Sequence, residues 1–134
     1  MKDITIGSTH SESIQVNESL LAKAVGSGDV AVYATPMMIA LMENTAASLL
    51  QPFLEDGETS VGTMMNTTHE AATPCGMNVS ATAEIIKQEG RKIVFQIIAK
   101  DEVTTIGTAV HERVIVKKEK FEAKTNAKLT HSLQ

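Results

Sequence analysis

The sequence predicts an α+β fold with one antiparallel sheet, and two patterns carry this prediction. Residues 37–50 form one long apolar segment, interrupted only by Glu43 and three small polar residues, which is typical of a helix buried on most sides. Residues 77–85 alternate between apolar and polar side chains, as in a half-buried antiparallel strand. A single long helix followed by several strands places the chain in the α+β class.

The start of the helix is marked by Thr35 and Pro36. A threonine oxygen can accept a free backbone N–H as N-cap, and proline suits the first helical position because it has no N–H to satisfy. Pro52 ends the helix at about residue 50. Before the helix we expect a short strand at residues 13–16 and a flexible loop at residues 26–29.

Four further strands are expected after the helix, arranged as a meander: residues 59–69, 77–85, 92–99 and 103–117. A turn at residues 88–91 joins the second and third of them as a hairpin. The run 117–120 alternates in charge, and we expect it to be the solvated end of the last strand.

The 134 residues are expected to form a single domain, 1–134, with a hydrophobic core of its own. The formal net charge of -4 argues against binding of nucleic acid. No segment approaches the ~18 apolar residues that span a bilayer, and the first residues lack the features of a signal peptide. We therefore expect no membrane partner and a cytoplasmic location.

No metal site is expected. The four histidines lie far apart in the sequence, without a cysteine pair and without helical spacing between histidines. The single cysteine, Cys75, cannot form an intrachain disulfide, which fits a reducing compartment. It lies in a turn sequence, where a structural role is favoured over that of a nucleophile.

The apolar helix also predicts an oligomer. One sheet can cover one side of residues 37–50 but not all of it, so apolar surface remains for another element to bury. A second copy of the chain is the simplest candidate, and grooves between subunits are frequent binding sites. We expect a homodimer, with a tetramer as a further option.

Three residues are chemically capable and lie near this helix: Thr35, Glu43 and His69. Positions eight apart in a helix are separated by roughly 12 Å along the axis and about 80° around it, so Thr35 and Glu43 cannot hydrogen-bond directly. An imidazole has two nitrogens on opposite edges, and His69 could therefore bridge the hydroxyl and the carboxylate. The alternative is that Glu43 reaches solvent or pairs with Arg113.

Several motifs, in the same order and spacing, resemble the fluoroacetyl-CoA thioesterase-like branch of the hotdog-fold thioesterases. They are Ala34-Thr35 with Leu41-Met42-Glu43, Gly62-Thr63, Thr68-His69 with Ala71-Ala72-Thr73-Pro74, and His111-Glu112-Arg113. The resemblance covers nearly the whole chain. It implies an antiparallel sheet wrapped around a long central helix, a dimer, and a catalytic set of Thr35, Glu43 and His69.

The function that the resemblance implies is hydrolysis of an acyl-CoA thioester of short or medium acyl length. His69, supported by Glu43, would take a proton from Thr35 or from a water that Thr35 holds, and CoA would leave as the thiolate. CoA is then part of the substrate, and no separate cofactor is expected. The alternative is a non-catalytic module that binds acyl-CoA or another small ligand on the same fold.

Gly62, Met42 and Arg113 are the candidate substrate-binding residues. Gly62 would let a ligand approach the backbone, although a β-bulge explains a strand glycine equally well. Arg113 shares a strand face with His111, and it serves either the CoA phosphates or an internal ion pair. Residues 26–32 lack the aromatic lid of fluoroacetyl-specific members, which argues against that specificity.

Overall fold

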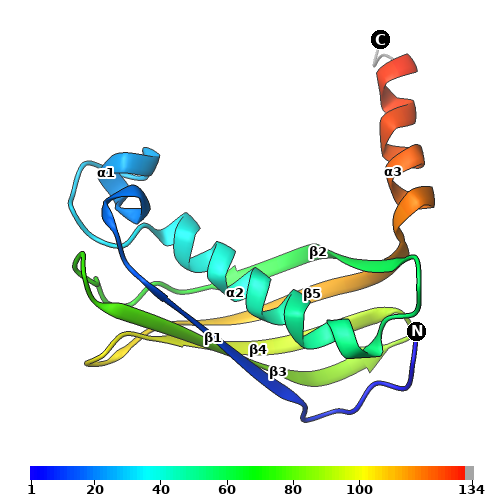
Figure 1. Cartoon of the computed structure of the whole chain (residues 1–134), viewed down its shortest axis with the longest axis horizontal. Coiled ribbons are helices and arrows are strands. Elements are labelled where there is room, and N and C mark those ends of the chain that lie inside the picture. Colours follow the sequence, from blue (N-terminus) through cyan, green and yellow to red (C-terminus); the bar gives the residue numbers. More distant parts are fainter. Residues whose placement is uncertain (132–134) are drawn as a thin grey trace.

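In the computed structural model, which describes residues 1–131, one curled antiparallel sheet wraps around a long helix (Figure 1). The helix, α2, spans Thr35–Leu50. The five strands are β1 (Thr9–Gln15), β2 (Glu58–Thr67), β3 (Asn78–Glu89), β4 (Lys92–Lys100) and β5 (Thr105–Lys117). Their spatial order is β1-β3-β4-β5-β2, so β1 and β2 are the two edges of the sheet. The predicted α+β class and long helix are confirmed.

The hydrophobic core lies between α2 and the concave face of the sheet. Met38, Met42 and Leu50 of α2 are fully buried against residues such as Phe95 and Ile97 of β4. The opposite stripe of α2 is exposed or half-buried, and it contains Ile39, Ala40, Glu43, Asn44 and Ala47. In the single chain the sheet covers one side of the helix only, and apolar surface remains on the other side, as expected from a single sheet.

The predicted meander is also wrong. β3, β4 and β5 do form consecutive antiparallel hairpins, but β2 pairs with β5 at the far edge and not with β3. Between β2 and β3 the chain crosses from the β2 edge to the other half of the sheet, where β3 lies next to the edge strand β1. This crossover brings the loop that follows β2 beside the start of α2, at the left in Figure 1.

The C-terminal part contains a helix where the charged end of a strand was expected. α3 spans Lys118–Asn126 and is followed by the 3-10 turn η3, Ala127–Thr130. Lysine, glutamate and alanine favour helix, and this segment has no strand beside it to pair with. None of its residues is buried, and α3 rises past the β2 edge in Figure 1.

Smaller elements complete the chain: the 3-10 turns η1 (Glu18–Leu20) and η2 (Gln51–Phe53), and the short helix α1 (Ala22–Val25). Tyr33, near the end of the loop that follows α1, forms an isolated bridge with Leu21, and Val32 forms one with Pro74. These bridges hold the loop against the body of the domain.

No helix in residues 1–131 has the length and hydropathy needed to cross a membrane.

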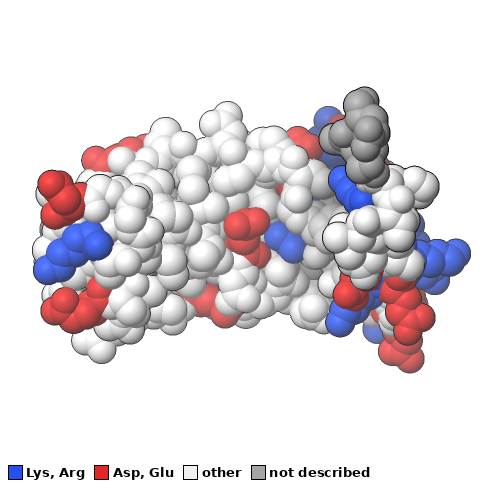
Figure 2. Space-filling model, turned by 90° about the horizontal axis from the view of Figure 1, so that it is seen from above, with Lys and Arg blue, Asp and Glu red and all other residues white. Residues whose placement is uncertain are grey.

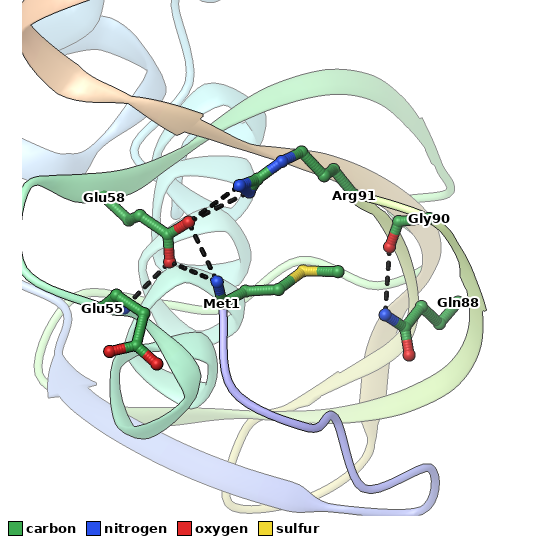
Figure 3. A network of polar contacts seen from close by, with 6 residues as sticks. All are labelled: Met1, Glu55, Glu58, Gln88, Gly90 and Arg91. Carbon is green, nitrogen blue, oxygen red and sulfur yellow. Dashed lines mark hydrogen bonds and ion pairs between the residues drawn. The ribbon is translucent and has the colours of Figure 1, made fainter.

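A polar network fixes the beginning of β2 (Figure 3). The carboxylate of Glu58 accepts hydrogen bonds from the backbone N–H of Glu55 at 2.8 Å, from the amino group of Met1 at 3.1 Å and from both Arg91 Nη atoms at 3.0 Å. The Glu55 N–H, followed by the Met1 amino group, lowers the pKa of Glu58. The network ties the start of the edge strand to the turn between β3 and β4.

Candidate active site

Thr35 and His69 lie together at the start of α2. The distance between Thr35 Oγ1 and His69 Nδ1 is 2.7 Å. The N-cap of α2 is Ala34, whose extended backbone (φ -74°, ψ 137°) precedes the helix, so Thr35 is the first helical residue and the prediction of Thr35 as N-cap is wrong. The N-cap Ala34 has no side-chain capping hydrogen bond, and the Thr35 hydroxyl contacts the His69 ring. This hydroxyl is therefore directed toward His69.

The backbone around His69 is held on both sides by β5. Thr68 N–H donates to the carbonyl of Thr108 at 3.0 Å, and Glu70 N–H donates to the carbonyl of Ile106 at 2.6 Å. Between these two anchors lies Gly107, where an added Cβ would stand 2.5 Å from the carbonyl oxygen of Thr68. Only glycine allows the loop to approach this closely. Sequence reasoning missed Gly107, although a glycine inside a strand pattern signals such a contact.

The loop that leads into α2 is also anchored. Tyr33 is fully buried; its hydroxyl donates to the carbonyl of Met37 at 3.1 Å, and its N–H donates to the carbonyl of Thr73 at 2.8 Å. Burial raises the pKa of Tyr33 to about 12, so the phenol stays protonated. Thr73 in turn donates to Asp101 Oδ2 at 2.9 Å. These contacts fix Thr35 relative to the segment that carries His69.

A cavity of about 270 Å³ opens beside Thr35 and His69. Its other walls are mostly small or apolar, and they come from α1, the loop after it and the segment after His69: Ala22, Ser27, Val30, Val32, Tyr33, Glu70, Ala71 and Ala72. A hydroxyl and an imidazole on the wall of an otherwise mainly apolar cavity form a site where a small uncharged group can meet a nucleophile.

Partial burial keeps His69 in its neutral form. Desolvation lowers the pKa of His69, and the nearby backbone of Ala71 opposes this shift more weakly. Nδ1 is engaged by Thr35, whereas Nε2 is buried and has no hydrogen-bond partner in residues 1–131. A neutral imidazole can accept the Thr35 proton at Nδ1 only when its own proton is on Nε2.

Glu43 belongs to a second cluster, further along α2. An added Cβ at Gly62 would lie 3.1 Å from Glu43 Oε2, 3.3 Å from His111 Cε1 and 3.4 Å from Arg113 Nη1. The charge of Glu43 raises the pKa of both His111 and Arg113, although burial lowers both by more. His69 does not bridge Thr35 and Glu43 within the described part of the chain, because its free nitrogen reaches no partner there.

Arg113 is held in a fixed position inside this cluster. Its Nε donates to Ser60 Oγ at 2.9 Å and its Nη2 to the carbonyl of Ser60 at 3.0 Å. The carbonyl of Met64 accepts from His111 Nδ1 at 2.7 Å, which leaves His111 Nε2 to accept from Arg113 Nη1 at 3.2 Å. Arg113 is 8% exposed and His111 is 1% exposed. In a single chain Arg113 therefore has structural contacts and little solvent access.

The other candidate substrate contacts fall in different environments. The pairing of β2 with β5 shifts between Gly62 and Met64, which agrees with the alternative of a bulge at Gly62, and Gly62 itself is exposed. Met42 is fully buried in the core, and its sulfur lies 3.8 Å from Thr67 Oγ1. Packing therefore explains Met42 in the single chain.

Comparison with known proteins assigns the family. A family model described as fluoroacetyl-CoA-specific thioesterase matches residues 16–119. The fluoroacetyl-CoA thioesterase of Streptantibioticus cattleyicolor is 44% identical over 97 residues, which are 72% of this chain and 70% of that protein.

Solved structures agree with this assignment. A structure of a fluoroacetyl-CoA thioesterase superposes with a TM-score of 0.89 at 34% identity, covering 95% of this chain and 98% of that one. A thioesterase superfamily member from Thermus thermophilus superposes with a TM-score of 0.88 at 31% identity, covering 95% and 94%. The predictions of a hotdog fold and of an acyl-CoA thioester hydrolase are confirmed. The chain belongs to the fluoroacetyl-CoA-specific thioesterase family.

Proposed function

We propose that Thr35, His69 and Glu43 form the catalytic set of an enzyme that hydrolyses short acyl-CoA thioesters to CoA and a carboxylic acid. The observation that carries this proposal is the contact of 2.7 Å between Thr35 Oγ1 and His69 Nδ1 on the wall of the cavity. A hydroxyl paired with a neutral imidazole is the arrangement that activates a weak nucleophile. The volume of about 270 Å³ favours a short acyl group.

In the proposed reaction, His69 Nδ1 accepts the proton of Thr35 Oγ1 while that oxygen attacks the thioester carbonyl carbon. The negative charge that develops on the carbonyl oxygen is stabilised by the positive end of the α2 dipole. The carbon–sulfur bond then breaks, and the CoA thiolate takes the proton from His69. In the second half, His69 Nδ1 accepts a proton from a water molecule while the water oxygen attacks the acyl carbon. The bond between that carbon and Thr35 Oγ1 then breaks, the carboxylic acid leaves, and Thr35 Oγ1 takes the proton back from His69.

The second route omits the acyl-enzyme: Thr35 holds a water molecule, and His69 takes the proton from that water. Mass spectrometry after rapid quench distinguishes the two routes. An added acyl mass on the peptide that contains Thr35 supports the covalent route, and a Thr35→Ala variant that keeps most of the activity contradicts it.

Glu43 enters the proposal as a fixed charge and not as a hydrogen-bond partner of His69 in the same chain. It lies on the uncovered stripe of α2 beside exposed Gly62, where a bound substrate has access to it. Its charge also acts on the buried Arg113 guanidinium, whose pKa it raises against the larger lowering by burial. We expect Glu43→Gln to lower kcat by about ten- to a hundredfold, with a smaller effect on KM.

We also propose that two chains form the working unit by pairing their β2 strands. β2 is a long edge strand with no buried residue in the single chain, and residues 59–68 carry no charge. Edge strands of monomers are normally protected by charges or proline, and this one is not. In Figure 2 the middle of this face is mostly uncharged, apart from one red and one blue group near its centre.

The proposed location is the cytoplasm, because the exposed thiol of Cys75 fits its reducing conditions.

The test is a panel of acyl-CoAs, from acetyl to octanoyl and including fluoroacetyl, assayed for thiol release. Cys75 contributes a background thiol, so the panel is run on Cys75→Ser as well. We expect turnover of the short acyl groups and a loss of about a hundredfold or more in Thr35→Ala and His69→Ala. Thr82→Ala, an exposed threonine on β3, is the matched control. Tight binding of one acyl-CoA without any turnover would favour the non-catalytic module.

A further inference from the structure

A second hollow lies at the other end of the sheet, between the last residues of β5 and α3. It has a volume of about 510 Å³. Val114, Val116 and Phe121 give it an apolar floor, and Phe121 is 41% exposed. Such a partly exposed aromatic ring beside an open hollow offers a surface on which a flat ring system can stack.

The rim of this hollow is positively charged. Lys117, Lys120 and Lys124 line it, together with Arg91. Arg91 already pairs with Glu58, whereas the three lysines have no ion-pair partner among the residues that the structure describes. We call Lys117, Lys120, Phe121 and Lys124 the basic groove.

The helical geometry of α3 separates this charge from the acidic residues of the same helix. At 100° per residue, Lys120, Phe121 and Lys124 fall within one arc, while Glu119 and Glu122 lie on the opposite side. The groove is therefore cationic although α3 as a whole is mixed in charge. Figure 2 shows both blue and red groups around α3. A ligand with several negative charges and one flat ring matches this combination.

The proposed dimer brings the groove next to the cavity of the other chain. Lys118 N–H donates to the carbonyl of Gly57 at 2.9 Å, so α3 begins beside the first residue of β2. When two β2 strands pair antiparallel about a two-fold axis, the start of one strand meets the end of the other. The end of β2 leads directly to His69. α3 rises from the β2 edge at the end where that strand begins (Figure 1), so the pairing would bring α3 close to the segment of the other chain that carries His69.

We propose that the basic groove of one protomer binds the phosphorylated adenosine end of the acyl-CoA whose thioester lies at Thr35 and His69 of its partner. CoA carries its phosphates and adenine far from the thioester, at the other end of the pantetheine arm, so a separate binding surface is required for them. The lysines contact the phosphates, and Phe121 stacks on the adenine. This inference rests on the proposed function and on the β2 dimer.

The first test separates the nucleotide from the thioester. In Lys120→Gln/Lys124→Gln we expect KM for acyl-CoA to rise about tenfold at low salt with kcat unchanged, because two phosphate contacts are lost. The matching acyl-pantetheine lacks the nucleotide, so the double variant and the wild type should hydrolyse it equally well. Lys87→Gln/Lys118→Gln removes the same charge outside the groove and is the control. An equal KM in both double variants, or an equal loss with acyl-pantetheine, would overturn the proposal.

The second test asks which protomer supplies the groove. A Thr35→Ala chain with an intact groove is co-assembled with a Lys120→Gln/Lys124→Gln chain, and the mixed dimer is isolated through two tags. If the groove serves the partner, one site per mixed dimer is complete, and about half of the wild-type activity at low acyl-CoA concentration returns. If the groove serves its own chain, neither site is complete, and the absence of recovery refutes the assignment.

Calorimetric titration with adenosine 3′,5′-bisphosphate keeps the two proposals distinguishable. The groove is supported if the wild type and the control variant bind this ligand and Lys120→Gln/Lys124→Gln binds it at least tenfold more weakly. If this binding is seen but no acyl-CoA is hydrolysed, only the proposed function fails. Hydrolysis together with equal binding by all three proteins refutes the groove and leaves the proposed function standing.

Discussion

Gly107→Ala tests whether close packing between β5 and the loop after β2 positions His69. An added Cβ would lie 2.5 Å from the Thr68 carbonyl oxygen, where at least 3.0 Å is needed, so the loop must move by about 0.5 Å. The Met38 sulfur, 2.9 Å from the same Cβ, is the end of a flexible side chain and can move more easily. The strain therefore falls on the residue that precedes His69.

The expected cost of this change in stability is about 1–3 kcal/mol, which is usual for overpacking a well-packed site. The reduced entropy of the unfolded chain on replacing glycine by alanine offsets up to about 1 kcal/mol of it. Displacement of His69 lengthens the 2.7 Å contact with Thr35, and we expect kcat to fall about tenfold or more because proton transfer depends steeply on that distance.

The assay compares two variants of similar stability. Ile85→Val removes one buried methylene from β3, far from His69, and should cost about 0.5–1.5 kcal/mol without moving the site. Urea denaturation gives the unfolding free energies, and thiol release gives kcat at a temperature where both variants are folded. A Gly107→Ala enzyme with wild-type kcat would refute the positioning argument, whatever its stability.

Further predictions concern the buried histidines and Arg113. Because burial lowers the pKa of His69 and the neutral form is the base, the acid limb of kcat/KM should have its midpoint below pH 6.5. His69 and His111 both have a lowered pKa in the folded state, so the unfolded chain takes up their protons first as the pH falls. The unfolding free energy should therefore have its full value above pH 6.5 and decrease as the pH drops below it. Arg113→Lys loses the guanidinium hydrogen bonds to Ser60 and His111, and it should lower the unfolding free energy measured with urea by about 1–3 kcal/mol. The same change at the exposed Arg91 should lower it by less.

The elements that depend on local pattern could be predicted from the sequence, and those that depend on distant contacts could not. The apolar run of α2 and the alternation in β3 are local, and both elements are present. Which edge of the sheet β2 occupies is decided by its pairing with β5, about fifty residues later in the chain. Neither strand has a pattern that specifies this partner. The local patterns therefore predict a meander, which is wrong because β2 pairs with β5.

The helix α3 is different, because its signal is local but ambiguous. Alternating charges at residues 117–120 suit a solvated strand as well as an exposed helix, but the richness of residues 118–124 in lysine, glutamate and alanine favours helix. The N-cap role predicted for Thr35 fails for the opposite reason. Its hydroxyl could cap α2 or bond a distant group, and only the packing of the segment around His69 decides between them.

Three features that a single chain leaves incomplete point to the same missing component. The stripe of α2 that contains Ile39 and Ala40 is uncovered, β2 has no buried residue, and the buried Nε2 of His69 has no partner in residues 1–131. A buried polar atom without a partner is rare in a finished fold, and a long uncharged edge strand invites pairing. The second copy proposed above, placed against β2, would cover the strand and the adjoining helix stripe together. We therefore expect substitutions that place lysine at exposed positions of β2, such as Asn66→Lys, to reduce dimer formation and activity in parallel.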